Sequence, residues 1–299
     1  MARQKYTPEE AREFAAQLTK RAEEQMVALL QSGQWQTYAN FLARFHRYSP
    51  NNARLILMQC PHAEIIAGFN HWKAHGRTIR KGEKAIHIYA PMSVKTNEAI
   101  LDPNDPDNLD AATPVRKTIF KLVPVFDVSQ TEGEPLPPEP GRGPLDASNR
   151  AQVIRDYMTL ADCLKRDGIA IEMPQRPEHE TSRGHWNADK RSICVYYTDN
   201  PADAYRVLLH ETAHYLAGHA GRADGLSKQE KEITVELAAY IAAAAQGYDL
   251  APQSIAYLAN WSREEPAKLR QYADSTHHLA RKLIDYIGAT KPAAAAAAA

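Results

Sequence analysis

The run His210-Glu211-Thr212-Ala213-His214 is the feature that most constrains this chain. In a helix, residues four apart lie on one face, so both imidazoles can reach a single metal ion. Glu211 follows the first histidine, where its carboxylate can take a proton from the attacking water. Because the chain has twelve histidines, such a run also arises by chance in roughly a few per cent of chains of this length, and its surroundings must decide.

The surroundings of this run predict a helix. Asn200 or Asp203 can cap its start, and Pro201 suits an early helical position. Apolar residues between Val207 and Leu216 can bury one side of the helix, and Gly218 then supplies a stop signal. Because a helix over these residues places both histidines on one face, the surroundings of the run favour a metal site.

Two histidines need a third ligand. In one zincin class this is a histidine six residues past the second, with a glycine midway, but Ala220 and Ala217 occupy those positions. The other class takes a glutamate from a following helix, and residues 228–245 form an alanine-rich helix by propensity. Glu232 and Glu236 share a face of it. We predict Glu236 as the third ligand because its neighbours are more apolar, with Glu232 in a supporting or surface position. The alternative is that Glu236 is a surface carboxylate.

Composition bounds the class of protein. The formal net charge of +0 argues against a chain that binds nucleic acid by overall charge. Cys60, Cys163 and Cys194 lack the spacing of a disulfide framework, which indicates a reducing compartment. The chain has no apolar leader and no apolar run long enough to cross a bilayer. We therefore expect a cytoplasmic protein without a membrane partner.

The chain divides into parts of different composition. Residues 129–150 are rich in Pro and Gly and predict a linker, while the acidic stretch 97–114 predicts a loop within a β-hairpin. Residues 291–299 are a low-complexity alanine tail. The expected fold class is α+β: a domain of helices and antiparallel strands over residues 1–128, followed by an α+β domain over residues 151–290. Periodicity predicts helices over 7–31, 34–45, 50–59 and 151–166, and a hairpin turning at 187–191.

Positive charge gathers in the first domain. Between Trp35 and Met92 the chain has eight Lys or Arg and two Glu, with aromatic residues interleaved. Single-stranded DNA favours this combination, because cations bind phosphates and bases stack on aromatic faces at about 1–3 kcal/mol each. The glycine-bounded segment 76–82 can follow a phosphate backbone. The alternative is that the aromatic residues are core and the cations a solvated rim.

Long motifs in both domains resemble a known family. The stretch YSPNNARLILMQCPHAEIIAGFNHWKAHGRTIRKGEKAIHIYAPM (residues 48–92), followed by VFDVSQTEG (residues 125–133), is similar to the N-terminal domain of ArdC-type antirestriction proteins. The helices carrying HETAH and KEITVELAAYIAA resemble the zincin-like C-terminal domain of the same family. The similarity covers nearly the whole chain in the same order.

The resemblance implies a single-stranded-DNA-binding domain and a metallopeptidase-like domain. In such proteins, often encoded on conjugative plasmids, these parts shield incoming DNA from host restriction. The resemblance supports one divalent metal ion, zinc or alternatively manganese, held by His210, His214 and Glu236, with Glu211 as the catalytic base. The DNA-binding candidates are Tyr48, Asn52, Trp72, Arg77, Arg80, Lys81 and Lys84.

Three functions remain open from the sequence. The first is an antirestriction protein that binds single-stranded DNA and carries a metal-bound gluzincin-type domain. The second is a DNA-targeted metallopeptidase that cleaves a protein substrate. In the third, the metal only holds the domain together. Two histidines, one glutamate and the extra Glu211 favour chemistry over a purely structural metal, which is usually closed by four Cys or His ligands.

Overall fold

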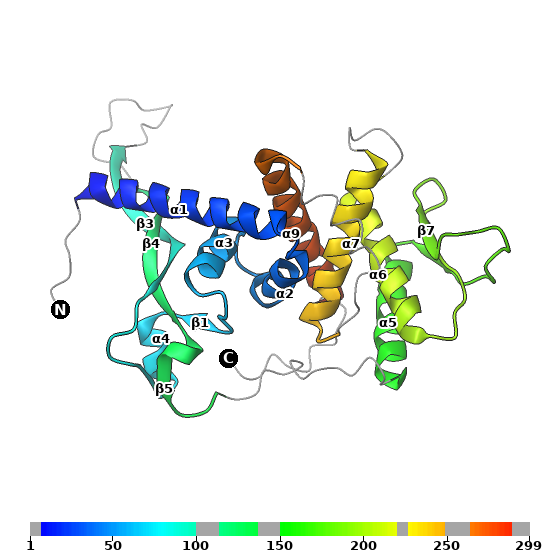
Figure 1. The fold of residues 1–299 in the computed structure, drawn as a ribbon, viewed down its shortest axis with the longest axis horizontal. Helices are drawn as coiled ribbons and strands as arrows, with labels where there is room; N and C mark the ends of the chain where they lie inside the picture. Colours follow the sequence, from blue (N-terminus) through cyan, green and yellow to red (C-terminus); the bar gives the residue numbers. More distant parts are fainter. Residues whose placement is uncertain (1–6, 100–113, 137–149, 220–226, 249–263, 289–299) are drawn as a thin grey trace. The chain divides into compact units, whose positions relative to one another are not determined.

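The computed structural model describes residues 7–99, 114–136, 150–219, 227–248 and 264–288 (Figure 1). It mixes helices and strands, so the predicted α+β class is confirmed. The helices are α1 (Pro8–Gln31), α2 (Trp35–Phe45), α3 (Pro50–Gln59), α4 (Phe69–Ala74), α5 (Arg150–Arg166), α6 (Pro201–Ala217), α7 (Lys228–Ala245) and α9 (Pro266–Gly288), with a 3-10 turn η2 (Val128–Gln130). The strands are β1 (Ile66–Ala67), β2 (Arg77–Ile79), β3 (Ile86–Ala99), β4 (Pro114–Asp127), β5 (Thr131–Gly133), β6 (Ala170–Glu172), β7 (Gly184–Asn187) and β8 (Ser192–Val195).

The polypeptide forms two compact units. The first contains residues 1–22 and 54–136, and the second contains residues 23–53 and 137–299. Residues 23–53, which the sequence places in the first domain, thus pack with the C-terminal part of the chain. The reason is the apolar face of α2, whose buried side chains lie against α7.

A long antiparallel hairpin forms the frame of the first unit. Strands β3 and β4 pair from Ile86 opposite Val125 to Ala99 opposite Pro114, which confirms the predicted hairpin. Most of the acidic stretch 97–114 lies outside the described residues. Strand β1 adds to the other side of β4, giving the order β1-β4-β3. The base of the hairpin carries the core, where Ile86, Ile88 and Val125 are buried.

Asp127 ties the end of β4 to its neighbours. Its carboxylate is fully buried and accepts from the backbone N–H groups of Glu64 at 2.8 Å and Ser129 at 2.9 Å. The chain then passes through η2 into β5, which pairs with β2. The first residues of the predicted linker, 129–133, therefore have regular structure, because their backbone groups form hydrogen bonds with the backbone of β2 and its neighbours. Residues 137–149 of that linker lie outside the described part.

Helix α7 lies at the centre of the second unit. Nearly every residue from Ile233 to Ala243 is buried, and α2, α6 and α9 all pack against it. A small sheet of order β6-β8-β7 completes the unit, with β8 parallel to β6 and antiparallel to β7. Strands β7 and β8 confirm the predicted hairpin. Within the described residues β7 pairs with β8 alone, so it is an edge strand of this sheet, and it lies beside α6.

The structure bears on membrane-spanning helices and on the state of the cysteines. Within the described segments, every helix is too short or too polar to cross a membrane. The three cysteines are free thiols, and all are buried.

Candidate metal centre and nucleic-acid interface

Helix α6 sets the two histidines of the centre. Asn200 caps its start by accepting from the backbone N–H of Ala202 at 3.0 Å, and Pro201 occupies the first turn, as predicted. One turn separates His210 from His214, so their rings lie on one face. Their Nε2 atoms are 3.2 Å apart and point to the same place.

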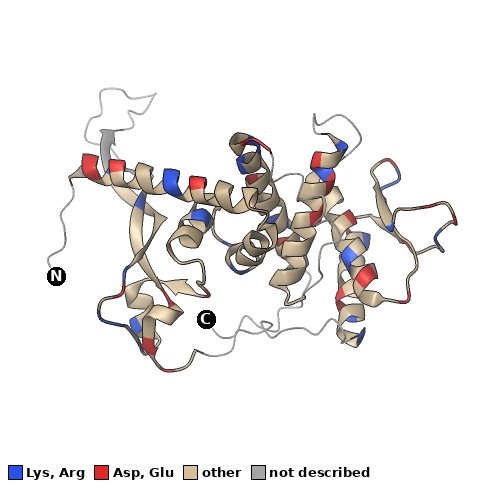
Figure 2. Ribbon diagram, in the orientation of Figure 1, with Lys and Arg blue, Asp and Glu red and all other residues tan. Residues whose placement is uncertain are grey.

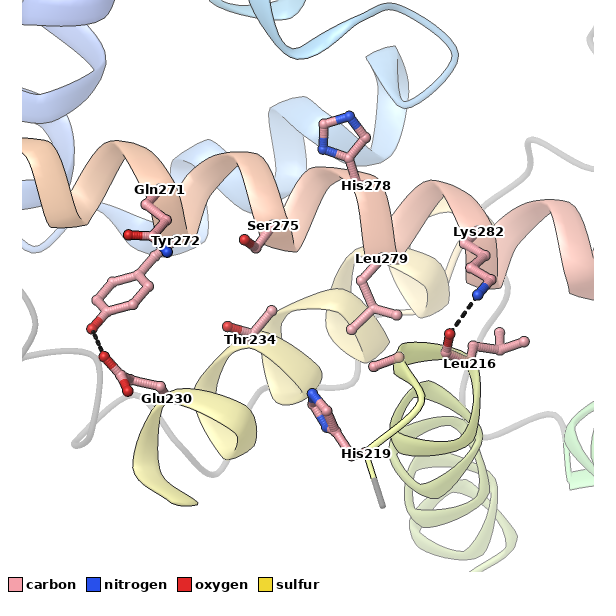
Figure 3. Close-up of a pocket in the computed structure, with 11 residues that line it drawn as sticks. Leu216, His219, Glu230, Thr234, Gln271, Tyr272, Ser275, His278, Leu279 and Lys282 are labelled. Carbon is pink, nitrogen blue, oxygen red and sulfur yellow. Dashed lines mark hydrogen bonds between the residues drawn. The ribbon is translucent and has the colours of Figure 1, made fainter. Parts of the chain in front are cut away.

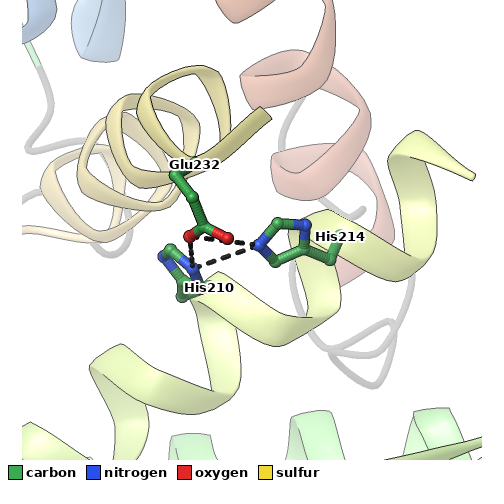
Figure 4. A group of neighbouring side chains, drawn as sticks. All are labelled: His210, His214 and Glu232. Carbon is green, nitrogen blue, oxygen red and sulfur yellow. Dashed lines mark hydrogen bonds and ion pairs between the residues drawn. The ribbon is translucent and has the colours of Figure 1, made fainter. Parts of the chain in front are cut away.

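Helix α7 brings a carboxylate to this place. A capping box starts α7. The Ser227 hydroxyl accepts from the Glu230 N–H, and the Glu230 carboxylate accepts from the Ser227 N–H. The Oε2 atom of Glu232 then lies 3.3 Å from His210 Nε2 and 3.6 Å from His214 Nε2 (Figure 4). Among the described residues, these three side chains form a group whose ligand atoms are close enough to hold one metal ion.

The spacing of the three atoms fits a divalent cation. Zinc bonds of about 2.0–2.2 Å at tetrahedral angles separate neighbouring ligand atoms by about 3.3–3.6 Å. The observed separations of 3.2, 3.3 and 3.6 Å agree with this range to about 0.1 Å. Two imidazoles and a carboxylate are also a donor set that leaves a coordination position open. The residues therefore fit the metal that the sequence predicts.

Glu236 lies elsewhere than the sequence predicts. Its carboxylate contacts Nδ1 of His210 at 2.8 Å, on the side of the ring that faces away from the ligand atoms, and it also meets Arg206 at 3.4 Å. Glu232 occupies the position expected for Glu236, and Glu236 occupies the supporting position expected for Glu232. Both share one face of α7, and the extra turn between them decides which nitrogen of His210 each reaches.

Glu211 points from α6 toward the small sheet. Its side chain is buried, the backbone N–H of Trp186 in β7 donates to it, and burial raises the pKa of the carboxyl group. Gly184 lets β7 approach this closely, because a Cβ there would lie 2.5 Å from Val207 Cγ1. The base candidate therefore sits between the histidine helix and the edge strand β7.

The electrostatics of the group couple its members. Burial alone would lower the pKa of His210, but the hydrogen bonds that its ring donates to the carboxylates of Glu232 and Glu236 outweigh burial and raise the pKa to about 10. Hydrogen bonds from His210, and to a smaller extent from His214, lower the pKa of Glu232. The two glutamates thus concentrate negative charge around His210, which would favour a cation at the same place.

A further side chain completes the surroundings of the centre. His219 lies past the end of α6, and its Nδ1 is 3.0 Å from Nδ1 of His214. The pattern of the histidine-ligand class assigns no role to His219, because that residue is one position short of the expected third ligand. The signal that would have found it is the glycine stop at Gly218.

The predicted DNA-binding residues fall in two groups. Tyr48 and Asn52 are half-buried residues of the second unit, whereas the other five belong to the first. Trp72 is 1% exposed, and its indole N–H donates to the carbonyl of Phe126 at 3.0 Å. Its ring is therefore core and offers no face to a base, so the alternative of an aromatic core applies to Trp72.

The cations of the first unit differ in what they contact. The guanidinium of Arg77 donates to Thr131 Oγ1 at 2.7 Å and to carbonyls of the β5 segment, so it holds β2 against β5. Arg80 forms an ion pair of 2.9 Å with Glu83. Lys81 and Lys84 are exposed in the loop between β2 and β3, where Figure 2 shows positive residues, as it does on α4. Lys81 and Lys84 are predicted phosphate contacts that project into solvent, whereas Arg80 is exposed as well but is paired with Glu83.

Comparisons with known proteins identify a matching family domain and a relative. The N-terminal domain of anti-restriction factor ArdC matches residues 9–126. An uncharacterized protein of Bacillus anthracis, pXO2-81, is 27% identical over an alignment that covers 75% of this chain and 42% of that protein. The chain thus spans less than half the length of this relative.

Solved structures share the fold. The metal-free crystal structure of the antirestriction protein ArdC from plasmid R388 is 16% identical, with a TM-score of 0.53 over 92% of this chain and 99% of that one. The Mn(II)-bound structure of the same protein is 17% identical, with a TM-score of 0.55 over 91% and 97%. Residues 9–126 of this chain thus match the ArdC N-terminal domain, and the chain shares the fold of an ArdC antirestriction protein over most of its length.

Proposed function

We propose that this protein is an antirestriction factor that binds single-stranded DNA of an incoming mobile element through its first unit and holds one divalent metal ion in its second. The observation that carries the proposal is the joint presence of the ArdC N-terminal domain and the His210, His214 and Glu232 group. The Mn(II)-bound structure of a protein with the same fold supports a divalent cation. We keep zinc as the first candidate and manganese as the second.

On this proposal the cation would be held by His210 Nε2, His214 Nε2 and a Glu232 oxygen. When bound, the cation would supply Lewis acidity. Glu236 holds Nδ1 of His210 so that Nε2 faces inward, and Arg206 in turn fixes Glu236. Glu211 receives and returns the proton of the attacking water, a role for which burial has already raised the pKa of its carboxyl group.

One observation favours a peptidase as a second candidate function. Glu211 lies beside the ligands without being one of them, and the edge strand β7 lies beside the same helix. An extended polypeptide could pair with that edge through backbone hydrogen bonds and present a carbonyl to the centre. A purely structural metal needs neither Glu211 nor an edge strand, so these features argue against that reading.

DNA binding by the first unit is supported by its exposed cations. Lys81 and Lys84 flank Gly82, whose φ of 94° makes the turn that presents them. Phosphates release counterions on binding such lysines, so the affinity would fall steeply with salt. Arg77 and Arg80 shape this loop through their contacts with β5 and Glu83.

The test of the DNA function uses the full-length chain and a labelled single-stranded oligonucleotide. Binding is measured across a salt series, with duplex of the same sequence as competitor. The proposal expects salt-sensitive binding with preference for the single strand, and slower cleavage of the bound strand by a nuclease. Equal binding of duplex and single strand, or no binding, would refute it.

A further inference from the structure

The end of α6 folds back on the second histidine of the centre. Gly218 adopts the left-handed conformation with φ 70°, and its N–H donates to the carbonyl of Tyr215 at 3.0 Å. The N–H of His219 donates to the carbonyl of His214 at 3.1 Å. These two bonds form a Schellman motif, which places the residue after the glycine against the residue five positions before it. Here the two residues in contact are both histidines.

The hydrogen bond between the two rings has one consistent direction. Their Nδ1 atoms are 3.0 Å apart, so one nitrogen must carry a hydrogen and the other must accept it. As a metal ligand, His214 uses the lone pair of Nε2, which faces His210 and Glu232. The hydrogen of the neutral His214 ring is then on Nδ1, and His219 is its acceptor.

We propose that His219 is a positioning residue for the metal centre. It fixes the tautomer and the ring orientation of His214, as Glu236 does for His210, and this role rests on the proposed metal site. A hydrogen bond to the outer nitrogen of a ligating histidine commonly contributes 10–100-fold to metal affinity. The geometry that supplies it here comes from a helix-ending motif, without a residue from another element.

The surroundings of His219 provide a matched control. Its ring is part of the wall of a cavity of about 250 Å³ between the end of α6, α7 and α9 (Figure 3). His278 lines the same cavity from α9, but its Nδ1 donates to the carbonyl of Asp274 at 2.7 Å. Removing His278 therefore changes the cavity wall without touching a ligand of the centre.

The experiment compares His219→Ala, His219→Phe and His219→Asn with His278→Ala in the full-length protein. Zinc affinity is measured by competition with a chromophoric chelator, and thermal unfolding of the metal-free forms confirms that each variant folds. Phe keeps a ring without an acceptor, whereas the side-chain oxygen of Asn sits at the position of Nδ1. If the Ala variant does not fold, the comparison of Phe with Asn decides.

We expect about 10–100-fold weaker zinc binding for the Ala and Phe variants. We expect recovery to within about threefold of wild type for Asn, as a retained acceptor requires, and no change for His278→Ala. Wild-type affinity in the Phe variant, or equal loss in Phe and Asn, would overturn the role of His219. Failure of the wild-type chain to bind zinc or manganese would instead overturn the metal site itself, and His219 with it.

Discussion

Replacing each of the two glutamates of α7 in turn shows which one is a metal ligand and which one supports a ligand. The change is Glu232→Ala in one variant and Glu236→Ala in another, with Gln229→Ala as a control at an exposed position of the same helix. Glu232 places one oxygen between the two Nε2 atoms, whereas Glu236 reaches only the outer nitrogen of His210. The first change therefore removes a bond to the cation, and the second only releases a ring.

The magnitudes follow from this difference. A four-ligand zinc site is stabilised by about 10–16 kcal/mol, so one ligand contributes about 3 kcal/mol, equivalent to a loss of more than a hundredfold in affinity. Loss of a hydrogen bond to a ligating histidine weakens binding by about 10–100-fold. We thus expect the order of zinc affinity to be wild type and Gln229→Ala, then Glu236→Ala, then Glu232→Ala.

Chelator competition on the dialysed full-length chain measures all four proteins on one scale. Metal content after dialysis against excess zinc provides the stoichiometry, for which we expect one ion per wild-type chain. If Glu236→Ala binds less tightly than Glu232→Ala, the reasoning from nitrogen positions is wrong and Glu236 is the ligand, as its apolar neighbours suggested.

Three further predictions concern catalysis, DNA and stability. Glu211→Gln should retain zinc and DNA binding but abolish any peptidase activity, and cleavage that persists in a casein assay would remove Glu211 as the base. Lys81→Ala with Lys84→Ala should reduce the slope of log affinity against log salt for single-stranded DNA by about 1.4, at about 0.7 per phosphate, while Lys165→Ala leaves it unchanged; an unaltered slope in the double variant would place both lysines outside the interface. Burial lowers the pKa of His277 from 6.5 to about 4, and its Nδ1 has no hydrogen-bond partner in the described structure. Because the unfolded chain takes up this proton first, the free energy of unfolding should fall by about 3 kcal/mol as pH drops from about 6.5 to about 4. Urea unfolding across that range should show a smaller decline for His277→Gln, and an equal decline would contradict the assignment.

The helices of the centre could be predicted from local signals. Asn200, Pro201 and Gly218 mark the ends of α6, and the alanine-rich run predicts α7 to its observed bounds. Such signals depend on backbone hydrogen bonds within a few residues, so one sequence is sufficient to find them. The pairing of β3 with β4 follows from the strand-like runs on either side of the acidic stretch 97–114.

The order of the two glutamates could not be predicted in this way. Glu232 and Glu236 share a helix face, and only the position of α7 along α6 decides which one meets Nε2. That position depends on packing between helices distant in the sequence. Apolar neighbours indicated burial correctly for Glu236, which is 8% exposed, but a buried carboxylate can serve a ligand as well as be one.

Residue type did not indicate how two of the DNA-binding candidates are placed in the fold. Trp72 and Arg77 belong to residue types that stack on bases and bind phosphates, yet one fills the core and the other joins β2 to β5. A cation near an aromatic residue in the sequence does not indicate whether carbonyls or solvent surround it. The pairing of β5 with β2, which uses Arg77, lies in a segment that composition assigns to a linker.

The most direct test of the central claim is the anomalous diffraction of crystals of the full-length protein grown with zinc, recorded on both sides of the zinc absorption edge. We predict one anomalous peak bounded by His210 Nε2, His214 Nε2 and a Glu232 oxygen, with Glu236 beyond the ring of His210. A peak on the Glu236 carboxylate, or none between the two histidines, would contradict the account.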